Sequence, residues 1–322
     1  MPARDAQRYI AECIDSILAQ SYFNWELIVV DDGSTDQTAK IINDYSMSDD
    51  RIRLFRQPAL GIIPALRLAY EKSNGNLITR MDSDDIMSSE KIEKLTDLLI
   101  LHGKGHVATG LVEYFSESGL GDGYRKYEKW LNELTRTRKN YTEIYKECCI
   151  ASPCWMLWRE DLDFSLAFKP DNYPEDYDLV FRFYQCNLKV VAVDDVLHRW
   201  RDHDVRSSKT VEHYKENSFL DLKVTYFIKL DYKYQKNLVL WGAGKKAKKV
   251  ARLLQERKID FIWVCNNAQK IGQKIYETVL LAVKDFNFSD KQVIVTLANN
   301  LDKDDASQLL STAKNCEYYF FC

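Results

Sequence analysis

The sequence lacks a dominant charge, a paired-cysteine motif and a long apolar run. Its 322 residues carry a net charge of −3, with acids and bases mixed along the chain, so no basic field attracts nucleic acid. None of the eight cysteines forms a C-x-x-C pair, which argues against zinc and thioredoxin-like sites and is typical of reduced cytosolic thiols. Because no run approaches a membrane span and no signal peptide stands out, we expect a cytoplasmic protein, with peripheral contact at the inner face of a membrane left open.

Length and composition predict a globular chain of two domains. Hydrophobic residues make up 46% of the chain and charged residues 29%, as is usual for globular proteins. A chain of 322 residues exceeds what one hydrophobic core usually supports. The patterns along the chain place the domains at residues 1–210 and 236–322, joined by a helical linker at 211–235.

An acidic cluster at residues 79–85 is the most informative stretch. Three carboxylates, Asp82, Asp84 and Asp85, fall within four residues, directly after the apolar-leaning residues 76–78. Such a cluster at the end of a buried strand is costly unless a cation neutralises it. Hard oxygen ligands on a short turn suit Mg²⁺ or Mn²⁺, which also bind the phosphates of a substrate. For an isolated D-x-D motif, a solvated acidic turn ahead of a helix would be the better interpretation.

Strands and helices alternate through the first hundred residues. Apolar spacing predicts helices at 6–20, 37–46, 61–72 and 89–101, and strands at 26–30, 51–57 and 77–81. This alternation is typical of a wound α/β sheet, in which the carboxyl ends of the strands bind ligands. Further along, the pattern predicts a helix beginning at 175, a strand at 189–193 and helix at 211–230. No strand precedes Met1–Pro2, where we expect a loop leading into the first helix.

The strand pattern restarts in the C-terminal part of the chain. We expect strands at 237–241, 261–265, 292–297 and 317–321, with helices between them. Gly242-x-Gly244 after the first of these strands resembles a dinucleotide-binding fingerprint. The next strand ends in Asn266-Asn267 and supplies no acid for a ribose. We interpret this part as a Rossmann-like module for packing or partner contact, with an NAD(P)-binding oxidoreductase as the alternative.

Residues 1–210 resemble the nucleotide-sugar-dependent glycosyltransferases of family 2, which have the GT-A fold. The resemblance is carried by several motifs in a fixed order: Pro2 and Asp5, residues 16–20, residues 25–36, residues 61–66, residues 81–85, Glu175-Asp176 with Arg182, and Arg201-Asp202-His203 with Ser207-Ser208. Residues 127–135 together with 241–245 also resemble an N-acetylglucosaminyltransferase-like protein of this family, across both domains. The implied fold is a mixed GT-A sheet flanked by helices, plus a smaller Rossmann-like α/β domain.

The resemblance implies a donor site for a nucleoside-diphosphate sugar, with a UDP sugar expected. Asp32 would hold the nucleobase, with Pro2 and Asp5 beside it. Asp82, followed by Ser83, would face the ribose and the metal. The metal ligands would be Asp84, Asp82 and His203, holding Mn²⁺ or Mg²⁺ at the diphosphate. Arg67 stands where the family commonly has Asn, and could reach the diphosphate or be a solvated helix residue.

The resemblance also implies an inverting transfer to a glycan or lipid-linked saccharide acceptor. Asp176 would be the general base that removes a proton from the acceptor hydroxyl. One displacement with one base inverts the anomeric centre, and the transferred sugar would be a hexose or an N-acetylhexosamine. Trp155 and Glu175 would border the acceptor pocket, where an aromatic face can stack on a sugar ring.

Plainer interpretations exist for each of these residues. Asp32 and Asp36 could form a turn and a helix cap, Asp176 could complement a helix dipole, and His203 could be an exposed loop residue. A tryptophan such as Trp155 is more often core than ligand contact. His198 is an alternative to His203. Because the first strand of the family is absent ahead of Pro2, a non-catalytic, degenerate transferase is a further alternative function.

Overall fold

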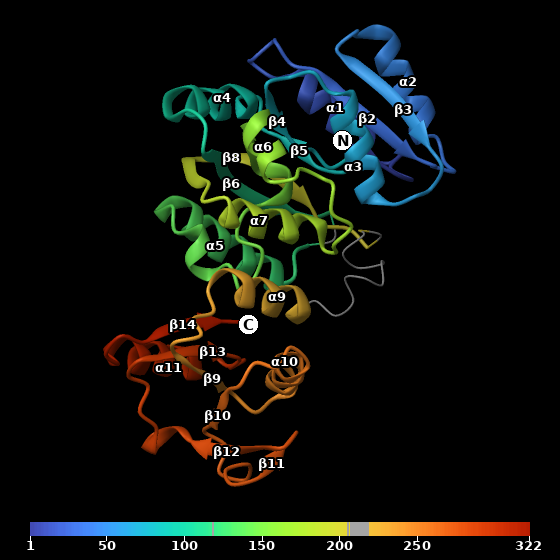
Figure 1. Ribbon diagram of the computed structural model, residues 1–322. Coiled ribbons are helices and arrows are strands. Elements are labelled where there is room, and N and C mark those ends of the chain that lie inside the picture. The colour runs from blue at the N-terminus through green and yellow to red at the C-terminus, as the bar shows by residue number, and fades with distance from the viewer. Residues whose placement is uncertain (118, 205, 207–218) are drawn as a thin grey trace. The chain divides into compact units, whose positions relative to one another are not determined.

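The computed structural model describes residues 1–117, 119–204, 206 and 219–322. Ser207, Ser208 and residues 211–218 of the predicted linker therefore lie outside the described residues. The chain divides into two compact units: unit 1 is Met1–Thr142 with Cys148–Lys215, and unit 2 is Glu143–Glu147 with Glu216–Cys322. Figure 1 shows the elements of both units. Within the described ranges no helix has the length and apolar character to cross a membrane.

The first sheet of unit 1 is parallel and has three strands, in the order β1 (Pro2–Ala3), β2 (Leu27–Asp32), β3 (Ile52–Gln57). Every residue of β2 is buried, as expected for a strand covered on both faces. Leu27 and Val29 belong to the main core, whereas Ile28 and Val30 belong to a second cluster. The helices of this region are α1 (Ile10–Leu18), α2 (Thr38–Ser48) and α3 (Ile62–Lys72).

The prediction of a loop at the start of the chain is wrong, because Pro2–Ala3 form a short strand. Pro2 pairs with Val30 and Ala3 with Asp31. The Met1 amine donates a hydrogen bond to the Ile28 carbonyl at 2.8 Å, and the Val30 amide donates to the Met1 carbonyl at 2.9 Å. Pro2–Ala3 therefore belong to the first sheet, as the neighbour of β2.

The second sheet of unit 1 is mixed and has five strands, in the order β4 (Leu77–Thr79), β7 (Trp155–Trp158), β6 (His106–Phe115), β8 (Lys189–Arg201), β5 (Ile86–Met87). Only β6 and β8 are parallel; the other pairs are antiparallel. β8 runs eight residues past the predicted end at Val193, because its second half pairs with both β6 and β5. The helices here are α4 (Lys91–His102), α5 (Asp122–Thr137), α6 (Arg159–Phe164) and α7 (Glu175–Gln185).

Unit 2 contains a separate six-stranded sheet, in the order β11 (Lys274–Ile275), β12 (Thr278–Ala282), β10 (Ile262–Cys265), β9 (Asn237–Trp241), β13 (Lys291–Val295), β14 (Glu317–Phe320). All neighbours are parallel except β11 and β12. Its α-helices are α9 (Leu220–Leu230), α10 (Lys245–Glu256) and α11 (Asn300–Thr312). The helix expected between β10 and β13 is wrong: residues 266–290 hold β11, β12 and one turn of 3₁₀-helix.

Candidate active site

The acidic turn lies between β4 and β5, and its three carboxylates have different partners. Asp82 accepts a hydrogen bond from Arg80 Nε at 2.8 Å, and Asp84 lies 2.8 Å from His203 Nε2. Asp85, which is buried, lies 3.0 Å from His198 Nε2. The turn therefore leaves Asp82 and Asp84 partly exposed and holds the buried Asp85 as an anchor.

Asp84 and His203 form a half-buried pair. The His203 ring lies against Tyr9, with 4.7 Å between ring centroids. Its Nδ1 atom is buried and has no hydrogen-bond partner within the described part of the chain. Although burial opposes the change, the hydrogen bond to His203 and the charge of Arg206 lower the pKa of Asp84. An ionised carboxylate beside an imidazole is a donor set that Mn²⁺ and Mg²⁺ can use.

The fit of a divalent cation is conditional on a local rearrangement. Among the described residues, no three His, Cys, Asp or Glu side chains are grouped as metal ligands. Asp82 is paired with Arg80, and Asp84 is paired with His203. For His203 Nε2 to act as a ligand, its contact with Asp84 Oδ2 must open, after which both side chains are available to a cation.

Asp85 anchors the turn through a buried network that the sequence did not reveal. Its second oxygen accepts a hydrogen bond from the Arg201 amide at 2.8 Å. His198 Nδ1 lies 3.4 Å from Lys91 Nζ, which donates to the Pro153 carbonyl at 2.5 Å. Since His198 is fully buried beneath the turn, it is not an alternative to His203 as an exposed ligand. The pairing of β5 with β8, in which Met87 lies opposite His198, brings Asp85 close to His198 and Arg201.

Arg80 is a second residue that sequence reasoning missed. Its side chain is 6% exposed and bridges two carboxylates, Asp82 at 2.8 Å and Glu175 at 3.0 Å. The guanidinium group thus connects the acidic turn to the start of α7. Its position two residues before Asp82 was the available signal, but an arginine beside acids is usually a local ion pair.

Asp176 stands in the first turn of α7, next to the buried Glu175. Burial, followed by the charge of Glu175, raises the pKa of Asp176 to about 7, whereas the charge of Arg80 opposes this rise. Its Oδ1 accepts a hydrogen bond from the Tyr177 amide at 2.8 Å. A carboxylate with a pKa near neutrality is suited to accept a proton during a reaction.

The proposed nucleobase-side residues organise the loops at the carboxyl end of the first sheet. Asp32, which is buried, accepts hydrogen bonds from the Gly61 amide at 2.9 Å and from Gln57 Nε2 at 2.7 Å. Asp5 accepts a hydrogen bond from the Thr35 amide at 2.8 Å. Pro2 lies in β1, beside β2. These contacts place Pro2, Asp5 and Asp32 at the edge where β1 and β2 end, and their role toward a nucleobase stays a prediction.

Trp155 and Arg67 have contacts in the structure that differ from those their expected roles assume. Trp155 is 1% exposed and packs against Phe168 and Phe183, so the expectation that it borders the acceptor pocket is corrected: the buried ring has no free face for a sugar. Arg67 donates to the Lys169 carbonyl at 2.8 Å and pairs with Asp171 at 2.7 Å. Its contacts are therefore with the loop before α7. Ser83 is half-buried in the acidic turn.

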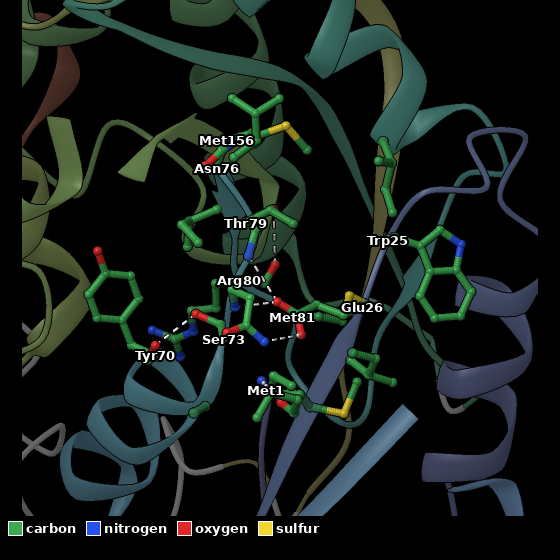
Figure 2. Close-up of a pocket in the computed structure, with 18 of the residues that line it drawn as sticks. Met1, Trp25, Glu26, Tyr70, Ser73, Asn76, Thr79, Arg80, Met81 and Met156 are labelled. Carbon is green, nitrogen blue, oxygen red and sulfur yellow. Dashed lines mark hydrogen bonds between the residues drawn. The ribbon is translucent and has the colours of Figure 1, made fainter. Parts of the chain in front are cut away.

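A pocket of about 620 Å³ lies in unit 1, beside the first residues of the acidic turn. Arg80 and Met81 line it, but the carboxylates of the turn do not. Figure 2 shows Trp25 and Tyr70 on opposite sides of this pocket, with Met1 below Arg80 in this view.

Sequence comparison identifies the family of this chain. A family model described as "Glycosyl transferase family 2" matches residues 1–164. The chain belongs to glycosyl transferase family 2. Among family relatives, the glycosyltransferase GlyA of Streptococcus pneumoniae serotype 4 is 27% identical over 252 residues, covering 75% of this chain. The chain covers only 36% of the length of GlyA.

Solved structures give the same fold for the family 2 part. S. aureus TarS, residues 1–349 in complex with UDP-GlcNAc, matches with a TM-score of 0.54 and 18% identity, over 79% of this chain and 70% of that 1–349 chain. The mannosyltransferase PcManGT of Pyrobaculum calidifontis, in complex with GDP-Man and Mn²⁺, matches with a TM-score of 0.50 and 17% identity, over 78% and 66% of the two chains. Unit 1 has a GT-A-like fold, and unit 2 carries a separate sheet.

Proposed function

We propose that this protein transfers a hexose or N-acetylhexosamine from a nucleoside-diphosphate sugar, specifically a UDP sugar, to a glycan or lipid-linked saccharide. The observation that carries the proposal is the link made by Arg80 between the acidic turn and α7. It joins Asp82, on the turn that also carries Asp84, to Glu175, which directly precedes the carboxylate suited to be a base, Asp176. The complex of TarS with UDP-GlcNAc is the reason for choosing a UDP sugar.

In the proposed donor site, Asp32, Asp5 and Pro2 lie on the nucleobase side, and Asp82 with Ser83 on the ribose side. Asp84, Asp82 and His203 would hold the cation. When bound, Mn²⁺ or Mg²⁺ offsets the charge that develops on the departing diphosphate. The Mn²⁺ in the complex of PcManGT with GDP-Man supports testing this metal first. Arg67 keeps a proposed diphosphate role only if it leaves Asp171.

The proposed reaction is a single displacement that inverts the anomeric carbon. Asp176 accepts the proton of the acceptor hydroxyl, the acceptor oxygen forms a bond to the anomeric carbon, and the bond to the diphosphate oxygen breaks. Glu175 would border the acceptor. Burial, followed by the charge of Glu175, keeps the pKa of Asp176 high, and the charge of Arg80 limits that effect. The base is therefore half ionised near neutral pH.

For unit 2 we propose a Rossmann-like module, with functional domains at 1–210 and 236–322 and a helical linker at 211–235. The parallel strands lie in the order β12-β10-β9-β13-β14, which in chain order is 3-2-1-4-5. However, Asn266 and Asn267 follow β10, where an NAD site would place an acid. Lys270 Nζ also donates to the Ala243 carbonyl at 2.7 Å, across the glycine loop. We therefore favour a packing or partner-binding role over NAD(P)-dependent catalysis.

Calorimetric titration of the full chain tests the proposal. UDP, GDP and NAD(H) are titrated with and without Mn²⁺, into the wild type and into Asp84→Asn. We expect UDP binding that depends on Mn²⁺ and is lost in Asp84→Asn, because the variant lacks an anionic ligand. Asp122→Asn, an exposed acid in the first turn of α5, is the matched control and should bind as the wild type does.

The other outcomes separate the alternatives. Equal UDP affinity with and without Mn²⁺ would remove Asp84 from the site. Binding of NAD(H) alone would move the active site to unit 2. A folded protein that binds none of these ligands would be a degenerate transferase.

A further inference from the structure

Helix α10 of unit 2 carries charges that are almost all of one sign. Its twelve residues hold one acid, Glu256, and five bases: Lys245, Lys246, Lys248, Lys249 and Arg252. The chain as a whole has a net charge of −3, with acids and bases in similar numbers. The bases of α10 are therefore a local concentration of positive charge that the overall composition does not explain.

Four of these bases share the side of α10 that faces solvent. The buried residues of the helix are all apolar and centre on one side of it. With 3.6 residues per turn, the bases on the opposite side are Lys245, Lys248, Lys249 and Arg252. Lys248 is half-buried and the other three are exposed. We call these four residues the basic face, which extends about 10 Å along the helix.

The basic face makes formation of α10 less favourable. Lys245, Lys248 and Lys249 lie near the positive end of the helix dipole, where acids are preferred, and the first turn holds no acid. Lys245 and Lys249 are four positions apart, which makes them neighbours of like charge. Lys245 and Lys248 form no ion pair with any described residue. An anionic partner against the basic face would therefore stabilise the helix.

A tyrosine borders the basic face. The Arg252 guanidinium carbon lies 5.2 Å from the centroid of the Tyr276 ring, and Arg252 Nη2 donates to the Tyr276 hydroxyl at 3.3 Å. Gln255 Nε2 donates to the Tyr276 carbonyl at 2.5 Å. The Tyr276 side chain is 37% exposed. Tyrosine is enriched where proteins meet membrane headgroups, because its ring is apolar and its hydroxyl is polar.

We propose that the basic face of α10, with Tyr276 at its border, docks this protein on an anionic phospholipid surface. Charge complementarity provides the affinity, because each Lys or Arg close to such a surface contributes to binding. The attraction acts within a Debye length, about 8 Å at physiological ionic strength. Docking would also hold the protein at the surface that carries a lipid-linked acceptor. That consequence rests on the proposed function, whereas the docking itself does not.

The arrangement of the charges favours an extended anionic surface over a small anion. Side chains on the outer face of a helix diverge, whereas a site for a single phosphate needs polar groups that converge on one point. The headgroups of a bilayer form a plane of phosphates, which several separate charges can approach together.

Co-sedimentation of the full chain with vesicles tests this inference. Vesicles of neutral phosphatidylcholine are compared with vesicles that also contain anionic phosphatidylglycerol, at low and at high salt. One variant neutralises the basic face with Lys245→Gln, Lys248→Gln, Lys249→Gln and Arg252→Gln. Its matched control neutralises four exposed bases of α5, with Arg125→Gln, Lys126→Gln, Lys129→Gln and Arg136→Gln.

We expect the wild type and the α5 variant to bind anionic vesicles but not neutral ones, with binding that weakens as salt is added. The α10 variant should lose roughly tenfold or more in its partition coefficient, because it lacks four charges near the surface. Its Tm should not fall below that of the wild type, because the substitutions relieve repulsion within the helix. Binding of UDP with Mn²⁺ is measured on the same samples, so failure of the donor site and failure of the docking surface give different results.

Three results would overturn the proposal. If the wild type did not bind anionic vesicles, the basic face would be a solvated surface. Equal losses in the α5 and α10 variants would mean that the overall charge of the protein, and not this face, governs binding. If the wild type bound soluble inorganic polyphosphate through α10 but did not bind vesicles, the partner would be a soluble polyanion.

Discussion

At the scale of single residues, Arg80 is the side chain on which the site geometry depends most. It is nearly buried and holds Asp82 and Glu175 together. Replacing it by a neutral residue leaves both carboxylates without a cation in a desolvated position. The cost of breaking a buried ion pair by removing one partner exceeds the value of the pair itself.

We expect Arg80→Met to lower the free energy of unfolding by about 3–5 kcal/mol. Arg80→Lys should recover part of this stability, because it keeps the positive charge. The recovery should be incomplete, because an ammonium group lacks the planar fork with which the arginine contacts both carboxylates. Urea unfolding measures both changes. Arg8→Met is the matched control: Arg8 pairs with Glu117 at 2.6 Å, but both side chains are about two-thirds exposed, so its loss should cost roughly 0–1 kcal/mol. Equal costs for the Arg8 and Arg80 variants would contradict the bridging role.

The raised pKa of Asp176 predicts how the rate of transfer depends on pH. A base must be ionised to accept a proton, so kcat/KM should rise with pH and reach half its plateau near 7. Glu175→Gln removes a neighbouring negative charge, and should therefore shift the profile to lower pH. Asp176→Asn should keep UDP binding and lose about 10²–10⁴-fold in rate. A normal rate in Asp176→Asn would place the base elsewhere.

The same shift predicts a change in stability with pH. The pKa of Asp176 is raised from its ordinary value of 3.8 to about 7 in the folded protein. Between pH 3.8 and about 7, the folded state therefore binds more protons than the unfolded state. The contribution of this group to stability is therefore present at low pH, and is lost as pH rises toward 7. Asp176→Asn should flatten this part of the stability curve, as measured by urea unfolding at pH 5 and pH 8. An unchanged slope would mean that the carboxyl group titrates alike in the folded and unfolded chains.

At the scale of elements, the two glycines of the loop after β9, Gly242 and Gly244, differ in whether the backbone tolerates a side chain. Gly242 has φ +135°, and a Cβ there would lie 2.3 Å from Thr296 Oγ1. Gly244 has φ −81°, and a Cβ there meets nothing within 4 Å. The first glycine is therefore required by the turn, whereas the second is open to a side chain.

Gly242→Ala should destabilise unit 2 by about 1–3 kcal/mol, because it combines an unfavourable backbone conformation with a close contact. Gly244→Ala should leave stability within roughly 0.5 kcal/mol of the wild type. Thermal unfolding followed by hydrogen exchange in β9 and β13 distinguishes the two variants. If Gly244→Ala proved the more damaging, the loop would adopt another conformation in solution.

Helices with a strong apolar periodicity were predicted well. Strands that form only by pairing with residues far away in the sequence were predicted poorly. The helices α1, α3, α4 and α10 agree with the apolar spacing of their residues. β8 was predicted too short, because its last residues, including His198 and Arg201, read as polar loop and become strand only by pairing with β5 and β6. The helix expected between β10 and β13 failed for the same reason: β11 and β12 are short strands stabilised by pairing.

At the scale of the whole molecule, the division into two compact units predicts that donor binding slows amide exchange in unit 1 and leaves unit 2 unchanged. The proposed donor residues all belong to unit 1. UDP with Mn²⁺ should therefore slow amide exchange around residues 32–36 and 79–85, and leave residues 237–265 unchanged. Hydrogen exchange with and without ligand measures this. Protection confined to 237–265 would instead indicate a nucleotide site in unit 2.

The sequence by itself determined the α/β class, most helices of unit 1, the acidic turn and the family resemblance. These features are local, because hydrophobic periodicity and short motifs are read from neighbouring residues. Only the tertiary structure decided that Asp84 pairs with His203, that Asp85 is anchored by His198, that Arg80 joins Asp82 to Glu175, and that Trp155 is core. These pairs are separated by up to 119 positions, so they depend on strand register and burial, which no local pattern encodes.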